Sequence, residues 1–148
     1  RRPLLARCCA GSGIITCVNQ FEHIFHASFE ENATLFNSYP LSRMHSALRY
    51  LGNAKLNSLL QKENAQELSG GEGQMMELVR AITADKPVVL MDESFSAVDE
   101  KNAQQLQKKL LALDKTILCV THDTSPEHLS LFDKVIQLER KENISYLL

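Results

Sequence analysis

Short runs of consecutive apolar residues divide the chain, and the clearest of them leads into two acids. Val88-Val89-Leu90-Met91 follows a proline and is followed directly by Asp92 and Glu93. The segments 14–18 and 116–120 are similarly rich in β-branched and apolar residues. Runs of this length, bounded by turn residues, are typical of strands buried on both faces of a parallel sheet. The pattern therefore predicts three such strands, over 14–18, 87–92 and 115–121.

Between the strands, apolar residues recur at helical spacing. In 40–51 they fall on one face, and Ser28 followed by Glu31 matches the capping box of a helix start. We expect helices over 28–36, 40–51, 56–60, 68–84, 99–113 and 126–131, and a further strand over 134–138. Because strand, helix and strand alternate, crossovers are required and the sheet should be mainly parallel. The predicted fold class is α/β, with residues 28–67 as a helical subdomain inserted between two strands.

The composition is that of a soluble domain of ordinary size. The chain has 148 residues, of which 44% are apolar and 23% charged, and its formal net charge is -2. A nucleic-acid-binding surface normally carries a basic excess, so this balance counts against one. No apolar run approaches the roughly 18 residues of a membrane span, and residues 1–13 lack the apolar centre of a secretory signal. Because the chain begins at Arg1, we expect it to be a piece or a processed product of something longer.

The cysteines are Cys8, Cys9, Cys17 and Cys119. Their spacing matches no zinc-binding pattern, and Cys17 and Cys119 lie within predicted strands. We therefore expect reduced core thiols in a cytosolic protein.

Polar residues follow the predicted strands at the place where a parallel sheet positions its functional groups. Asp92 and Glu93 follow the second strand, His122 the third and Gln20 the first. Since successive strand residues point to opposite faces, one acid could hold a metal ion while the other orients or deprotonates a water. Taken singly, each of these residues is equally compatible with an ordinary solvated loop.

A second candidate site is Leu68-Ser69-Gly70-Gly71-Glu72, which opens a helix. A glycine-rich helix start exposes backbone N–H groups and the positive end of the helix dipole, which favours an anion such as phosphate. The same residues also form a good N-cap after a flexible turn, and that alternative stays open. Ser96-Ala97-Val98-Asp99 forms a turn into the next helix.

Together these motifs resemble the nucleotide-binding domain of an ABC transporter, in the ATP-binding cassette family. Gln20 resembles the Q-loop glutamine, and 68–72 is similar to the LSGGQ signature with Glu72 at its last position. Val88–Asp92 resembles Walker B with Glu93 as the adjoining catalytic glutamate, Ser96–Asp99 resembles the D-loop, and His122 the switch histidine. These motifs lie in family order and cover nearly the whole chain. His23-Ile24-Phe25 and Glu31–Phe36 resemble the exporter branch.

The resemblance implies a P-loop NTPase-like fold, N-terminally truncated, in three parts. We expect a partial ATPase core with the Q-loop over 1–24 and a helical subdomain with the signature motif over 25–84. Residues 85–148 would form the ATPase core with Walker B, the D-loop and the switch histidine.

It also implies ATP and Mg²⁺ as cofactors, and a role for each motif. Asp92 would hold Mg²⁺ together with Gln20, and Gln20 would report the nucleotide state. Glu93 would polarise the attacking water and His122 would contact the γ-phosphate. Five further residues would contact ATP, the signature residues acting on the nucleotide of the opposite subunit: Ser69, Gly70, Gly71, Glu72 and Asp99.

The implied function is that of the ATP-hydrolysing subunit or domain of an ABC exporter, which couples hydrolysis to transport across a membrane. Its partners would be membrane-spanning domains and a second nucleotide-binding domain in a head-to-tail dimer, with no nucleic acid. It would act at the cytoplasmic face of the cell membrane. The alternatives are a soluble ABC ATPase that acts on nucleic acid or ribosomes, and a non-catalytic interaction module that kept the fold.

The sequence departs from the family pattern in three respects. No Walker A loop, G-x-x-x-x-G-K-[ST], precedes Gln20, and Gly11-Ser12-Gly13 has neither its lysine nor its spacing. We therefore expect the 148 residues alone to be inactive as an ATPase. Gly73 and Met75 stand where the family often has basic residues, and Ser94 replaces a residue that is often proline or alanine.

Overall fold

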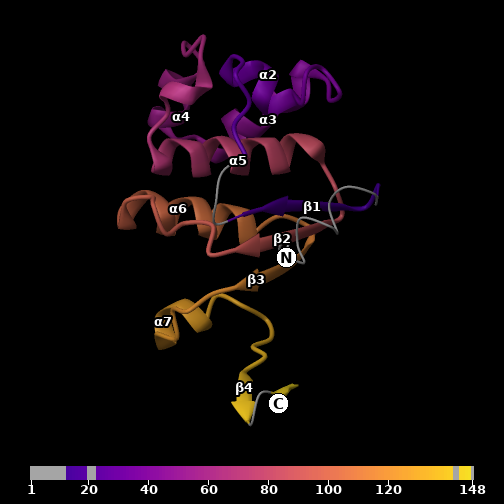
Figure 1. Ribbon diagram of the computed structural model, residues 1–148, viewed down its shortest axis with the longest axis vertical. Coiled ribbons are helices and arrows are strands. Elements are labelled where there is room, and N and C mark those ends of the chain that lie inside the picture. Colours follow the sequence, from indigo (N-terminus) through magenta and orange to yellow (C-terminus); the bar gives the residue numbers. More distant parts are fainter. Residues whose placement is uncertain (1–12, 20–22, 142–143, 148) are drawn as a thin grey trace.

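The centre of the molecule is a three-stranded parallel sheet (Figure 1). The computed structural model describes residues 13–19, 23–141 and 144–147. The strands are β1 (Ile15–Val18), β2 (Val88–Asp92) and β3 (Thr116–Val120), in the order β1-β2-β3. Both pairs are parallel, and Met91 is in register with Val18 on one side and Cys119 on the other. The predicted parallel α/β sheet is thereby confirmed, and the carboxyl ends of its strands lie at one edge.

Helices fill the chain between the strands. Those between β1 and β2 are α2 (Phe29–Thr34), α3 (Leu41–Leu51), α4 (Ala54–Leu59), the 3-10 helix η1 (Ala65–Glu67) and α5 (Gly70–Ala84). α6 (Glu100–Leu111) lies between β2 and β3, and α7 (Pro126–Leu129) follows β3. In Figure 1, α5 separates α2, α3 and α4 from the sheet. In the part of the chain that the structure describes, no helix is both long and apolar enough to cross a membrane.

Helix α5 is at the centre of the core because apolar residues cover most of its circumference. It contacts α2 and α3 on one side and β1 on the other. Its buried methionines Met75 and Met76 belong to the same cluster as Met91 of β2 and Leu106 of α6. Burying a side chain of this size contributes about 1.5–3 kcal/mol. The packing therefore holds α5 firmly against the sheet that carries the candidate site.

Side-chain caps determine where the helices begin. At α2, Ser28 Oγ accepts a hydrogen bond from the N–H of Glu31, whose carboxylate accepts one from the N–H of Ser28 at 3.0 Å. The predicted capping box is therefore present, and Ser69 and Glu72 form a second one at α5. α5 ends at Ala84, because the C-cap residue Asp85 has a left-handed φ of 51° that stops the helix.

Within the described residues the sheet is well buried on one face only, so the expectation of strands covered on both faces is wrong. Along β2, Val89 and Met91 are buried, whereas the alternate residues are only partly so. On β3 the outer face presents Leu118 and Val120, which are 55% and 49% exposed. The reason is that side chains alternate across a strand, and the cluster formed with α5 and α6 takes in the inner face alone.

The strand predicted over 134–138 is also wrong. Residues 134–137 form no strand, and Val135 and Ile136 are exposed. Pairing begins instead at β4 (Leu138–Lys141), which runs antiparallel to β5 (Ile144–Leu147) in a separate two-stranded sheet. An apolar run becomes a buried strand only where a neighbouring strand and a covering layer are available, and here the partner strand is the segment that follows it in the chain.

The expectation of reduced thiols is confirmed for Cys119 and wrong for Cys17, and Cys8 and Cys9 lie outside the described residues. Cys17 is disulfide-bonded. A disulfide needs a second cysteine within reach in space, which spacing along the chain does not reveal. Among the described cysteines Cys119 is a free thiol, and its pKa is raised by burial and by the negative charge of Asp92.

Candidate active site at the carboxyl edge of the sheet

The ends of β2 and β3 bring Glu93 and His122 into contact. His122 Nε2 lies 2.7 Å from Glu93 Oε1, and the Glu93 side chain is 25% exposed whereas that of His122 is 88% exposed. The N–H of Glu93 donates to the carbonyl oxygen of Val120 at 3.1 Å, which extends the ladder beyond the strand end. Glu93 also has a left-handed φ of 46°, an uncommon conformation that clusters at functional sites. A carboxylate oriented in this way by an imidazole is suited to act as a general base.

Asp92, the last residue of β2, is the predicted metal ligand. It is partly buried and in register with Val120. No group of three or more His, Cys, Asp or Glu side chains that could hold a metal ion occurs in the described ranges. Mg²⁺ is nevertheless commonly bound through one or two carboxylates, with waters and substrate phosphates as its other ligands. Asp92 therefore fits a magnesium ion that binds jointly with a nucleotide. The other predicted ligand, Gln20, lies outside the described residues.

Glu93 and His122 line an open cleft of about 950 Å³. Its walls come from α6, from the end of β3 and from residues 121–131. The charged side chains that line it comprise four acids and a lysine: Glu93, Glu100, Asp123, Glu127 and Lys108. This balance disfavours a triphosphate unless positive charge from elsewhere compensates the carboxylates.

The predicted signature residues form the start of α5. Ser69 Oγ accepts from the N–H of Glu72 at 3.4 Å, and the N–H of Ser69 donates to Glu72 Oε2 at 2.9 Å. The second hydrogen bond lowers the pKa of the Glu72 carboxyl group. Gly70 and Gly71 occupy the first two helical positions, whose N–H groups have no acceptor within a helix. Both readings of this sequence, a helix cap and an anion-binding helix start, are thus compatible with the geometry.

The start of α5 packs against the turn that follows Glu93. A Cβ atom at Gly71 would collide with the carbonyl oxygen of Ala97. One turn later the buried Gln74 donates to Ser96 Oγ at 3.2 Å and accepts from the N–H of Ala97 at 3.0 Å. The predicted signature and D-loop segments therefore lie side by side, joined by a glutamine that the sequence analysis did not single out.

Asp99, the last residue of the predicted D-loop, caps α6. Its carboxylate accepts from Asn102 Nδ2 at 2.7 Å and from the N–H of Asn102 at 3.1 Å. These hydrogen bonds lower the pKa of Asp99. Asn102 also accepts from Asn53 Nδ2 at 2.7 Å, which ties the cap to the start of α4. The contacts of Asp99 within the described residues thus stabilise a helix start, and its contact with ATP stays a prediction.

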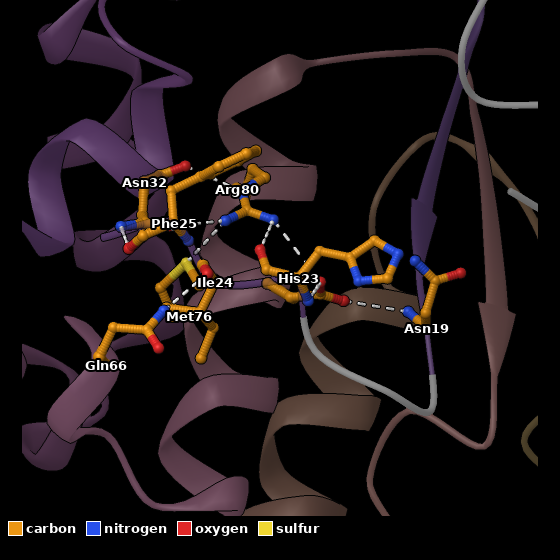
Figure 2. Close-up of polar contacts among 9 residues, drawn as sticks. Asn19, His23, Ile24, Phe25, Asn32, Gln66, Met76 and Arg80 are labelled. Atoms are coloured by element: carbon orange, nitrogen blue, oxygen red, sulfur yellow. Dashed lines mark hydrogen bonds and ion pairs between the residues drawn. The ribbon is translucent and has the colours of Figure 1, made fainter. Parts of the chain in front are cut away.

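Further buried polar residues near this edge were missed by the sequence analysis. Ser94, noted above only as a departure from the family pattern, donates from Oγ to the carbonyl oxygen of Val18 at 2.9 Å and so joins the ends of β1 and β2. Glu77 and Arg80 of α5 bind the chain that follows β1, and Figure 2 shows Arg80 directed at His23 and Asn32. The available signal was a pair of charged residues, Glu77 and Arg80, within the mainly apolar stretch 75–84.

A family model described as ABC transporter matches residues 6–96 of the chain. Among curated proteins, the thiamine import ATP-binding protein ThiQ of Haemophilus ducreyi is 42% identical over 80 residues, which cover 51% of this chain and 37% of ThiQ. The glutathione/L-cysteine transport system ATP-binding/permease protein CydC of Escherichia coli is 31% identical over 139 residues, which cover 88% of this chain and 24% of CydC. The matched region thus spans well under half of the length of these relatives.

Among solved structures, a bacterial Atm1-family ABC exporter with ATP bound superposes with a TM-score of 0.63 at 21% sequence identity. The match covers 75% of this chain and 21% of that chain. At this identity the similarity concerns the fold, and it agrees with the predicted P-loop NTPase-like α/β class.

Proposed function

The chain belongs to the ABC transporter family, as part of a nucleotide-binding domain, and from that premise we propose that the intact protein couples ATP hydrolysis to export across a membrane. The observation that carries the proposal is the 2.7 Å contact between Glu93 and His122. It places an oriented carboxylate at the carboxyl edge of a parallel sheet, where α/β proteins bind their ligands.

In the proposed reaction Glu93 accepts the proton of the water that attacks the γ-phosphate. His122 holds the Glu93 carboxylate in position and lies, exposed, where it can contact the phosphate. Phosphoryl transfer depends mainly on positioning and charge stabilisation. Glu93 and His122 are therefore sufficient to position and deprotonate the attacking water. Asp92, with Gln20, would hold Mg²⁺, which neutralises charge on the phosphates when bound.

We assign the remaining candidate residues to a second nucleotide site. In a head-to-tail dimer, Ser69, Gly70 and Gly71 would offer their N–H groups to the ATP of the partner domain. Support for this comes from the exposure of Ser69 and Gly70 at the start of α5. Glu72 orders that helix start through the capping box, and Asp99 would contact the nucleotide from the adjoining turn.

The proposed partners are membrane-spanning domains, which would place the protein at the cytoplasmic face of the cell membrane. The division into a core part over 1–24, a helical subdomain over 25–84 and a second core part over 85–148 belongs to the same proposal. Export is favoured by the similarity of 23–36 to the exporter branch. Import is the second candidate, since ThiQ, a thiamine import protein by name, is 42% identical over its match.

Reconstitution of the full-length protein into liposomes tests the proposal. We expect phosphate release from Mg-ATP, and ATP-dependent movement of a solute out of the compartment that contains the nucleotide. Movement in the opposite direction would replace export by import. If the purified protein released no phosphate above background, the ATPase assignment would be wrong.

The 148 residues by themselves should behave differently. They contain no glycine-rich loop with a lysine to surround the phosphates, and most of the charged side chains that line the cleft beside Glu93 are acids. We expect an affinity for Mg-ATP no better than roughly millimolar, about 4 kcal/mol, and no turnover. Isothermal titration together with a phosphate-release assay measures both, and micromolar binding would contradict this expectation.

A further inference from the structure

We propose that Glu77 is a positioning residue that, with Arg80, fixes the chain on both sides of residues 20–22 to helix α5. The inference rests on the proposed ATPase function, because the chain fixed in this way is the one that carries Gln20. It assigns a role to a buried carboxylate outside the five motifs by which the sequence resembles the family.

Glu77 spans the two ends of this short segment with its two oxygens. The N–H of Asn19 donates to Oε2 at 3.1 Å, and the N–H of His23 donates to Oε1 at 2.7 Å. The side chain of Glu77 is only 3% exposed. A buried carboxylate is costly unless it is fully hydrogen-bonded, and these backbone donors satisfy one oxygen each. Glu77 thereby sets the distance between the end of β1 and His23.

Arg80, one turn further along α5, binds the same part of the chain. Glu77 binds the N–H of His23, whereas Arg80 binds its carbonyl oxygen. Its Nη1 donates to the carbonyl oxygen of His23 at 2.9 Å and lies 3.5 Å from Glu77 Oε1. Its Nε and Nη2 donate to the carbonyl oxygen and the Oδ1 of Asn32, at 2.8 and 3.1 Å. Figure 2 shows these hydrogen bonds converging on Arg80. Since Asn32 Oδ1 also accepts from the N–H of Phe25 at 2.8 Å, residues 23–25 are bound to both α5 and α2.

The same helix also binds the turn after β2. Gly71, Gln74, Glu77 and Arg80 follow one another at intervals of three residues. In a helix of 3.6 residues per turn, each such step rotates by about 60°. The contacts therefore follow a spiral around α5. Gly71 and Gln74 contact Ala97 in the turn after β2, and Glu77 and Arg80 bind His23. A rigid α5 would therefore hold the chain after β1 and the turn after β2 in a fixed position relative to each other.

A merely structural role is the alternative, and the chemistry argues against it. Buried ion pairs contribute little net stability, and an apolar pair of similar size often serves as well. The Glu77 carboxylate instead accepts one N–H from Asn19 and one from His23. It therefore fixes the positions of these two residues relative to α5. Replacing Glu77 should therefore lower the turnover rate rather than the affinity for the nucleotide.

The test compares Glu77→Gln with Thr83→Val in the full-length protein. Glutamine keeps the shape but leaves one of the two N–H groups facing an amide NH₂ group. Thr83 is buried on the same helix and donates from Oγ1 to the carbonyl oxygen of Val79 at 2.7 Å, so this hydrogen bond stays within α5. Its replacement removes a buried hydrogen bond and serves as the matched control. Arg80→Lys is the second variant, which keeps the charge but loses the planar fork of donors.

Two quantities are measured, hydrogen exchange of the amides of residues 19 and 23 and the kinetics of ATP hydrolysis. We expect Glu77→Gln to raise exchange at these amides about tenfold and to lower kcat about tenfold, with the KM for ATP unchanged. Arg80→Lys should show the same split with a smaller change, and Thr83→Val should leave both quantities at wild-type values.

Three results would overturn the proposal. One is unchanged exchange at residues 19 and 23 in Glu77→Gln. The second is a loss of kcat no greater than in Thr83→Val, and the third is a rise in KM equal to the fall in kcat. If the wild-type protein hydrolyses no ATP, the proposed function fails instead, while the exchange measurement still decides whether Glu77 holds the chain.

Discussion

The imidazole Nε2 of His122 lies 2.7 Å from Oε1 of Glu93, although the two residues follow different strands. Parallel pairing of β2 with β3 produces this contact, because it places the carboxyl ends of both strands at the same height. The pair is the basis of the proposed chemistry, and the first two predictions concern it.

Replacing Glu93 by glutamine should reduce turnover to a small residual rate while ATP binding persists. The amide keeps the size of the side chain but cannot accept the proton of a water, and a general base contributes about 10²–10⁴-fold. Phosphate release and ATP affinity are measured on the full-length protein. Glu63→Gln, at an exposed position, is the control and should behave as wild type. Hydrolysis near wild-type rates in Glu93→Gln would remove Glu93 from the mechanism.

Removal of the imidazole in His122→Ala should lower kcat at least tenfold, because the Glu93 carboxylate loses the group that orients it. Residues that act as one unit give strongly non-additive effects. The double variant of Glu93→Gln and His122→Ala should therefore be no slower than Glu93→Gln alone. Additive losses in this cycle would show that the two side chains act independently.

Replacing Gly71 by alanine should destabilise the protein, although alanine is the better helix former by about 1 kcal/mol. The new Cβ would collide with the backbone oxygen of Ala97, and crowding of this kind typically costs about 1–3 kcal/mol. Thermal unfolding measures the effect. Gly13→Ala is the matched control, because a Cβ there meets nothing within 4 Å. Equal melting temperatures for the two variants would contradict the close packing of α5 on the turn after β2.

The ion pair between Asp85 and Lys115 should make stability depend on pH in acid. Lys115 Nζ donates to Asp85 Oδ1 at 2.8 Å, and this hydrogen bond lowers the pKa of Asp85. The folded-state pKa lies below the unfolded value of about 3.9. The stabilisation is therefore present above that value and is lost as the pH falls through the folded pKa.

Replacement of Asp85 by asparagine should lower the free energy of unfolding at neutral pH by less than about 1 kcal/mol, because the carboxylate is 56% exposed and screened by water. The curves of the variant and the wild type should converge in acid. Urea unfolding between about pH 6 and pH 2 measures this window, which brackets the ordinary aspartate pKa. Asp114→Asn, next to Lys115 in an exposed position, is the control. A constant difference over the whole range would exclude titration of Asp85 as the cause.

The sequence by itself determined the local features of this protein. The capping box at Ser28, the N-cap alternative at Ser69 and the strands at 88–92 and 116–120 were predicted from residues that are close together in the chain. Hydrogen bonds of caps and the period of apolar residues involve neighbours within one or two turns, so the pattern encodes them directly. The order of the motifs also indicated the family, which the comparisons confirm.

The tertiary structure decided which distant groups meet. Glu77 binds Asn19 and His23 across 58 and 54 residues of chain, and no spacing rule connects these positions. It also decided that Leu118 stays exposed and that pairing after residue 134 begins only at Leu138. Such outcomes depend on which layer covers each face and which backbone supplies a partner. A strand sequence states only that its side chains alternate, and packing in three dimensions then determines which side is buried.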